Sequence, residues 1–189
     1  MEKLFELIID EEDESGVSMI ALVDLPAIER DFQKFNQANK ITFKVADEDK
    51  RIASGYAMVA DLPIYRYDEQ VGDHYVVFRK PTIEKIVNKF MRQGLNSEIN
   101  LMHNSPVKDV YVFESLLIDK DRGITAPDGF QDAPDGSWFV SMRVDNDKVW
   151  NEIKEGKYKG FSVEGMFAKE EAIPTDEQII DAAIDAING

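Results

Sequence analysis

The chain has 189 residues and a mass of 21.5 kDa, and 43% of its residues are hydrophobic, so we expect one globular domain rather than a disordered chain. It contains no cysteine, which excludes disulfides, thiolate metal sites and a cysteine nucleophile. The formal net charge of -15 repels phosphate and anionic lipid, and no apolar run approaches the ~20 residues that cross a bilayer. We therefore expect an intracellular protein that contacts neither nucleic acid nor membrane directly and needs no cofactor.

The first half of the chain predicts mainly strands. Strand patterns cover Leu4 to Ile9, Gly16 to Val23, Ile41 to Ala46, Ile52 to Ala60 and His74 to Phe78. The acidic run between the first two strands, Asp10 to Glu14, is predicted to be a solvated loop, because it lacks the spaced ligands and central glycine of an EF-hand. A helix follows Pro81, with an apolar stripe from Ile83 to Met91 and Gly94 at its end.

The second half alternates strands with one short helix. Strands are predicted over Ile99 to His103, Val110 to Ile118, Ser137 to Val144 and Lys159 to Ala168, and a helix over Asp147 to Glu155. The 18 residues from Asp119 to Gly136 form a long loop without periodicity, a kind of loop that often carries function. After Pro174, apolar residues up to Ile187 recur on one face of a C-terminal helix.

These elements, about nine strands and three helices, predict an α+β domain that is mainly β, with a barrel-like sheet flanked by helices. We expect residues 1–169 to form this single domain. Residues 170–189 would be a linker followed by the amphipathic helix, which could tether the protein to a partner or form a homodimer.

Nucleophilic catalysis in this chain would have to use serine, histidine and a carboxylate, because cysteine is absent and no lysine lies in an apolar run. His74 begins a predicted strand and is expected to be structural. His103 lies where a strand meets a turn, which a substrate could reach, although position alone leaves a structural role open. Ser162 lies between Gly160 and Gly165, which permit close approach of another backbone, although a strand with two bulges is the simpler interpretation. The spacing does not fit the nucleophile elbow of α/β hydrolases.

Several segments together resemble a known family. They are Met102 to Asn104, Val110 to Ser115, Ser137 to Val144, Val149 with Trp150, and Gly156 to Gly165. In their order and spacing the chain resembles the XkdF-type phage serine proteases, which are related to the caudovirus prohead proteases. The resemblance extends from about residue 4 to residue 168. It implies a serine endopeptidase with a barrel fold similar to that of herpesvirus assemblin.

The resemblance maps the family's catalytic serine onto Ser162 and its catalytic histidine onto His103. The third member is open. Glu114 lies eleven residues after His103 on the following predicted strand, so a hairpin could return its carboxylate to the imidazole, with a surface ion pair as the alternative.

A second feature of the resemblance suggests a circular permutation. In the prohead proteases a segment similar to Ser-Leu-Val-x-x-Pro-Ala follows the serine, whereas here the similar string, Ala21 to Ala27, precedes the histidine. We expect this N-terminal strand to occupy the place of a C-terminal strand in those relatives. In those relatives an acidic residue comes just ahead of this segment, and the matching position here is Met19, which cannot orient an imidazole. Glu114 or Asp24 would then substitute for the acid, or the site would work as a dyad.

The resemblance implies a head-maturation protease that trims scaffold and major capsid protein precursors inside the phage procapsid, in the bacterial host cytoplasm. An alternative is a catalytically impaired head-assembly or structural protein with the same fold. A third hypothesis, from the residues alone, is a calcium-dependent binding module that uses Asp10 to Glu14 and Asp119 to Asp135.

Overall fold

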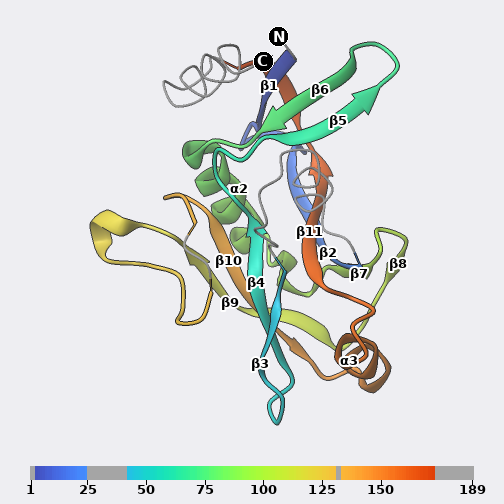
Figure 1. Cartoon of the computed structure of the whole chain (residues 1–189). Coiled ribbons are helices and arrows are strands. Elements are labelled where there is room, and N and C mark those ends of the chain that lie inside the picture. The colour runs from blue at the N-terminus through green and yellow to red at the C-terminus, as the bar shows by residue number, and fades with distance from the viewer. Residues whose placement is uncertain (1–2, 25–41, 131–132, 173–189) are drawn as a thin grey trace, which may run out of the picture.

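The computed structural model describes residues 3–24, 42–130 and 133–172, which form three four-stranded sheets (Figure 1). The first sheet contains, in order, β12 (Ala168–Glu171), β1 (Lys3–Ile8), β6 (Gly72–Val77) and β5 (Ile64–Asp68). The second contains β3 (Lys44–Asp47), β4 (Ile52–Met58), β10 (Trp138–Val144) and β9 (Val110–Leu117). The third contains β11 (Gly160–Met166), β2 (Gly16–Val23), β7 (Ile99–Leu101) and β8 (Ser105–Pro106).

Two α-helices accompany the sheets within the described residues. They are α2 (Lys80–Arg92) and α3 (Asp147–Lys154), and two short 3-10 helices are η1 (Leu95–Ser97) and η2 (Lys120–Arg122). The predicted apolar stripe of α2 is confirmed, because Ile83, Ile86 and Phe90 are fully buried. Asn146 caps α3 by accepting a hydrogen bond from Val149 N through its side chain. Neither helix combines the length and apolar composition needed to span a membrane.

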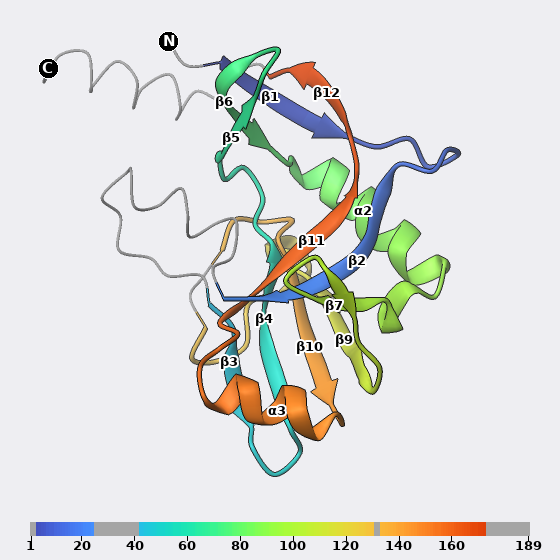
Figure 2. The same cartoon turned by 90° about the vertical axis from the view of Figure 1, so that its right-hand side faces the viewer.

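The expectation of a mainly β, α+β fold is confirmed, but the described strands form three open sheets and no closed barrel. The reason lies at one end of the third sheet, where Gly16 of β2 pairs with Met166 of β11. Beyond this point the segments next to β2 and β11 leave the third sheet on the same side, and β1 and β12 pair in the first sheet. The long antiparallel ladder therefore bridges two sheets, as the course of β11 and β2 toward β12 and β1 in Figure 2 shows.

The second and third sheets enclose the main core together with α2. Phe43 N donates to Lys159 O and Lys159 N donates to Val23 O, which joins the edges of the two sheets next to β11. The core side chains include Leu22, Met142 and Trp138, whose indole packs edge-on against Phe90 at 5.2 Å between ring centroids.

The chain after Met166 differs from the prediction of one strand up to Ala168. β11 ends at Met166, and β12 is a separate strand of the first sheet that includes residues 170 and 171, which were expected to begin a linker. Ala172 N then donates to Leu4 O. The predicted C-terminal helix lies outside the described residues.

Candidate active site

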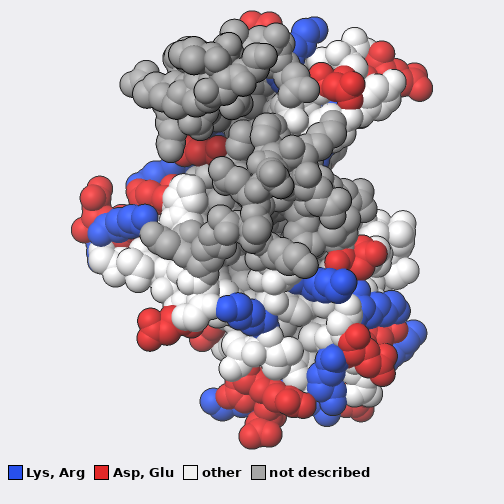
Figure 3. Space-filling view, in the orientation of Figure 1, with Lys and Arg blue, Asp and Glu red and all other residues white. Residues whose placement is uncertain are grey.

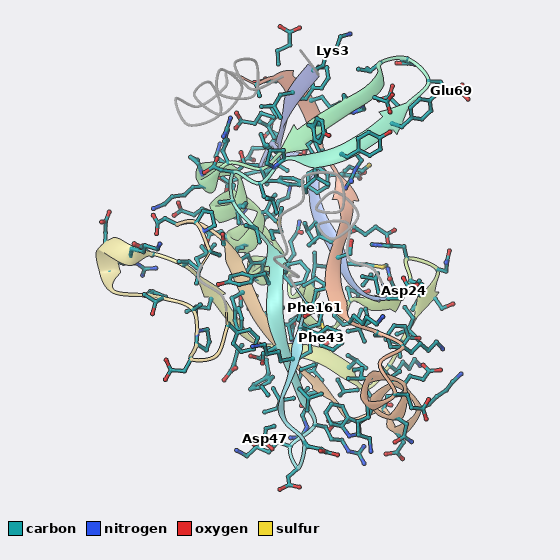
Figure 4. The ribbon with its side chains drawn as sticks, in the orientation of Figure 1. Lys3, Asp24, Phe43, Asp47, Glu69 and Phe161 are labelled. Atoms are coloured by element: carbon teal, nitrogen blue, oxygen red, sulfur yellow. The ribbon has the colours of Figure 1, made fainter. Side chains whose placement is uncertain are left out.

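Ser162 lies on the outer face of the third sheet. Its neighbour Phe161 points into the core against Phe43, with ring centroids 5.1 Å apart (Figure 4). Because successive side chains of a strand alternate between faces, Ser162 and Glu164 both point away from that core. Ser162 is half-buried and Glu164 is exposed, so the hydroxyl lies on a surface that another molecule can approach.

One row of residues connects Ser162 to the strand that leads to His103. Ser162 pairs with Ala21 on β2, and Ala21 pairs with Asn100 on β7. Adjacent strands are spaced ~4.8 Å apart, so the Cα atoms of Ser162 and Asn100 are separated by roughly 10 Å on the same face. The turn that follows the short strand β7 therefore lies near the face that carries Ser162.

His103 is held in a tight turn directly after β7. Asn104 N donates to Leu101 O at 3.1 Å, and the two central residues of this turn, Met102 and His103, have φ angles of 56° and 58°. Residues other than glycine rarely adopt this left-handed backbone conformation, so surrounding contacts must maintain it. One of them is the Asn100 side chain, whose Oδ1 accepts a hydrogen bond from His103 N at 3.1 Å.

The carboxylate that contacts the imidazole is Glu164. His103 Nδ1 lies 3.3 Å from Glu164 Oε2, and a carboxylate has no donor, so Nδ1 carries the proton of this hydrogen bond. Asn100 Nδ2 donates to the same Oε2 at 2.8 Å. The side chains of His103 and Glu164 are 39% and 45% exposed, so solvent screens this pair.

The serine and the histidine share a face but are not bonded. Among the residues that the structure describes, the Ser162 hydroxyl makes no hydrogen bond to the His103 ring. With Nδ1 turned toward Glu164, the opposite ring nitrogen, Nε2, remains for another partner. The geometry thus brings an imidazole and a carboxylate together at the β7 turn, on the face of the third sheet that also carries Ser162.

Glu114, the acid expected from the sequence, lies elsewhere. It belongs to β9 of the second sheet, pairs with Ser141 of β10, and lines an open pocket of about 440 Å³ with Lys44, Ser54 and Phe130. Ser54 and Ser141 are buried there and hydrogen-bonded to each other at 2.8 Å. The hairpin from β7 does not return Glu114 to His103.

Glu164 and Asn100 were missed by the sequence analysis. The alternation of β11 would have placed Glu164 on the face of Ser162, but nothing in the sequence shows which strand lies beside it. Met19 of β2 pairs directly with Glu164 of β11. Glu164, the carboxylate that contacts His103, therefore lies on the strand next to β2 in the third sheet.

Gly165, which follows Glu164, lies where any larger residue would clash with the backbone of Gly16. A Cβ on Gly165 would lie 1.9 Å from Gly16 O, at the bulge where β11 and β2 leave the third sheet. The expected close approach of another backbone is thus made by β2 of the chain itself.

His74 is a structural residue in this fold. It is almost completely buried in β6, its Nδ1 lies 2.9 Å from Gly72 O, and its Nε2 lies 3.3 Å from Lys169 Nζ. Because Lys169 can only donate and the Gly72 carbonyl can only accept, Nδ1 donates to Gly72 O and Nε2 accepts from Lys169 Nζ. It has no connection to the face of Ser162.

The acidic segments proposed for calcium bind cationic side chains of the protein instead. Lys89 Nζ donates to the backbone oxygens of Asp10, Asp13 and Ser15. In the long loop, Asp119 accepts from Arg122, and Asp135 accepts from Lys80, which lowers the pKa of the Asp135 carboxyl. No three potential metal ligands converge within the described residues. On the face of the molecule that Figure 3 shows, acidic and basic side chains are interspersed.

Comparison with known proteins identifies one family. A family model described as "Putative phage serine protease XkdF" matches residues 39–171, which is most of the chain and includes His103 and Ser162. No curated protein and no solved structure matches the chain.

Proposed function

The chain belongs to the family of phage serine proteases represented by XkdF, and on that basis we propose that it is a serine endopeptidase with Ser162 as its nucleophile. His103 would be the general base, and Glu164 would orient it. The observation that carries this assignment is the 3.3 Å contact between His103 Nδ1 and Glu164 Oε2, on the face from which Ser162 projects.

The proposed mechanism follows from this arrangement. Glu164 keeps the proton on Nδ1, so Nε2 can accept the Ser162 proton as Oγ attacks the substrate carbonyl. The resulting imidazolium returns that proton to the leaving amine, and water then hydrolyses the acyl-enzyme by the same steps. The Ser162–His103 hydrogen bond would form when substrate binds, since catalytic hydrogen bonds in free enzymes are often long. Backbone amides near the glycines of β11 would stabilise the oxyanion.

We propose scaffold and major capsid protein precursors as the substrates, cleaved inside the procapsid in the host cytoplasm. Support comes from the resemblance to prohead proteases. The pairing of β2 with β11, and of Met19 with Glu164, also supports the proposed permutation relative to assemblin-like proteases, with β2 in the place of their C-terminal strand.

Cleavage of these precursors by the purified protein tests the proposal. We expect Ser162→Ala and His103→Ala to lower kcat/KM by several powers of ten, more than ~4 kcal/mol of transition-state stabilisation. Ser97→Ala, an exposed serine in η1, is the matched control and should cleave as the wild type does. Cleavage that survives both site substitutions would refute the assignment.

The alternative is a catalytically impaired head-assembly protein with the same fold. One observation favours it: within the described residues the Ser162 hydroxyl is not bonded to His103. In that case the wild type and Ser162→Ala would be equally inactive on every precursor, while both would still assemble with them.

A further inference from the structure

Asn100 is the one buried polar side chain of the third sheet among the described residues. It lies in the middle of β7, it is 3% exposed, and it pairs with Ala21, which in turn pairs with Ser162. A buried amide is costly unless its groups are hydrogen-bonded. Its partners therefore indicate why a polar residue stands at this position.

Both ends of the Asn100 amide form hydrogen bonds with residues of the candidate active site. Oδ1 accepts from His103 N at 3.1 Å, and Nδ2 donates to Glu164 Oε2 at 2.8 Å. The orientation of the amide follows from its partners, because a backbone N–H requires an acceptor and a carboxylate requires a donor. The same Oε2 contacts His103 Nδ1, so one amide connects the backbone of His103 with the carboxylate that its ring meets.

Neither group would keep its place without support. The turn that carries His103 has two consecutive positive φ angles, and the hydrogen bond from His103 N to the Asn100 side chain supports it. Glu164 is 45% exposed on an outer face, and a long side chain in that setting samples several rotamers. Asn100 removes freedom from both groups.

We propose that Asn100 is the positioning residue of the site, which sets the tautomer of His103 by fixing the distance between its Nδ1 and Glu164. This inference rests on the proposed function for its catalytic consequence, but not for its geometric one. Asn100 is almost completely buried, and we assign it no contact with the substrate. Its loss should therefore lower kcat and leave KM unchanged.

The sharpest substitution is Asn100→Asp, which keeps the shape and the acceptor for His103 N but removes the donor to Glu164. It also places a second carboxylate against Oε2, where like charges repel. We expect kcat to fall about 10- to 100-fold, the range that corresponds to one lost hydrogen bond to a charged group.

The decisive readout is the His103 tautomer, measured by nitrogen NMR of the ring in the full chain. The chain has two histidines, so buried His74 serves as an internal reference for folding. We expect the Nδ1–H form of His103 in the wild type and a mixture of both tautomers in Asn100→Asp and in Glu164→Gln, with the His74 signals unchanged. The same measurement is valid if no substrate is ever cleaved, which separates this inference from the proposed function.

A double-mutant cycle tests whether Asn100 acts through Glu164. If it does, Asn100→Asp, which keeps the acceptor for His103 N, combined with Glu164→Ala should lower kcat no further than Glu164→Ala alone, whereas an independent structural role would give additive losses. Additive losses, or a His103 tautomer that Asn100→Asp leaves unchanged in a folded protein, would overturn the proposal.

Discussion

Lys89 provides the most quantitative prediction for the fold. Its side chain is 5% exposed, and its three N–H donors are used by the backbone oxygens of Asp10, Asp13 and Ser15, at 2.8, 2.6 and 2.7 Å. Lys89→Met keeps the aliphatic stem and removes the ammonium. The acidic loop between β1 and β2 would then lose the group that holds it against α2.

The expected loss of stability can be bounded. Three hydrogen bonds to a charged group would contribute roughly 4.5–9 kcal/mol if each contributed the usual ~1.5–3 kcal/mol. The ammonium, however, also loses several kcal/mol of solvation on burial, and the freed loop oxygens can bind water. We expect Lys89→Met to lower the free energy of unfolding by about 2–4 kcal/mol, or the Tm by roughly 4–16 °C for a domain of this size.

Denaturant and thermal unfolding of Lys89→Met beside Lys85→Met measures this effect. Lys85 lies on the exposed side of the same helix, so its substitution should change stability by less than ~0.5 kcal/mol. Equal stability of the two variants would show that the hydrogen bonds from the Lys89 ammonium to the loop oxygens do not stabilise the fold, which would refute the prediction. Calcium should leave the Tm of the wild type unchanged, because Lys89 occupies the place where the loop oxygens converge.

Two further predictions concern the strands near the site and the pH dependence of stability. Gly165→Ala places a Cβ against the backbone of Gly16, so denaturant unfolding should show a loss of about 3 kcal/mol; a loss below ~1 kcal/mol would mean that the bulge adapts without strain. The hydrogen bond from Lys169 lowers the pKa of Asp68 from 3.8 to about 2, so the folded state gains stability from this carboxylate above pH 4 and loses it as the pH falls toward 2. Thermal melts should therefore show Asp68→Asn less stable than the wild type at pH 7, with the difference disappearing near pH 2; a difference independent of pH would contradict this linkage.

Much of the fold follows from local sequence patterns. β2 carries a continuous apolar run and α2 a regular apolar period, so their residues were predicted nearly to the boundary. β5, β8 and β12 were missed for physical reasons: β12 is exposed throughout, β8 has two residues, and β5 exposes Tyr67. Backbone pairing with a neighbouring strand, rather than burial of an apolar face, maintains these strands, and single-sequence patterns do not report such pairing.

The candidate site was predictable in part. His103 and Ser162 were identified through a resemblance, and the structure brings both to one face of the third sheet. The acid was not predictable, because Glu114 was chosen for its place on the predicted strand after His103, whereas the structure places Glu164 against the imidazole. Which carboxylate reaches His103 depends on β2 lying between β11 and β7, a long-range pairing that no local pattern encodes.

Labelling of the full chain with a serine-directed fluorophosphonate, followed by mass mapping of the modified residue, tests the central claim without knowledge of the substrate. We predict modification of Ser162, its loss in His103→Ala, and a rate lowered at least about tenfold by Glu164→Gln but not by Glu114→Gln. A reagent that leaves Ser162 unmodified, or modifies it equally fast in His103→Ala, would contradict the account.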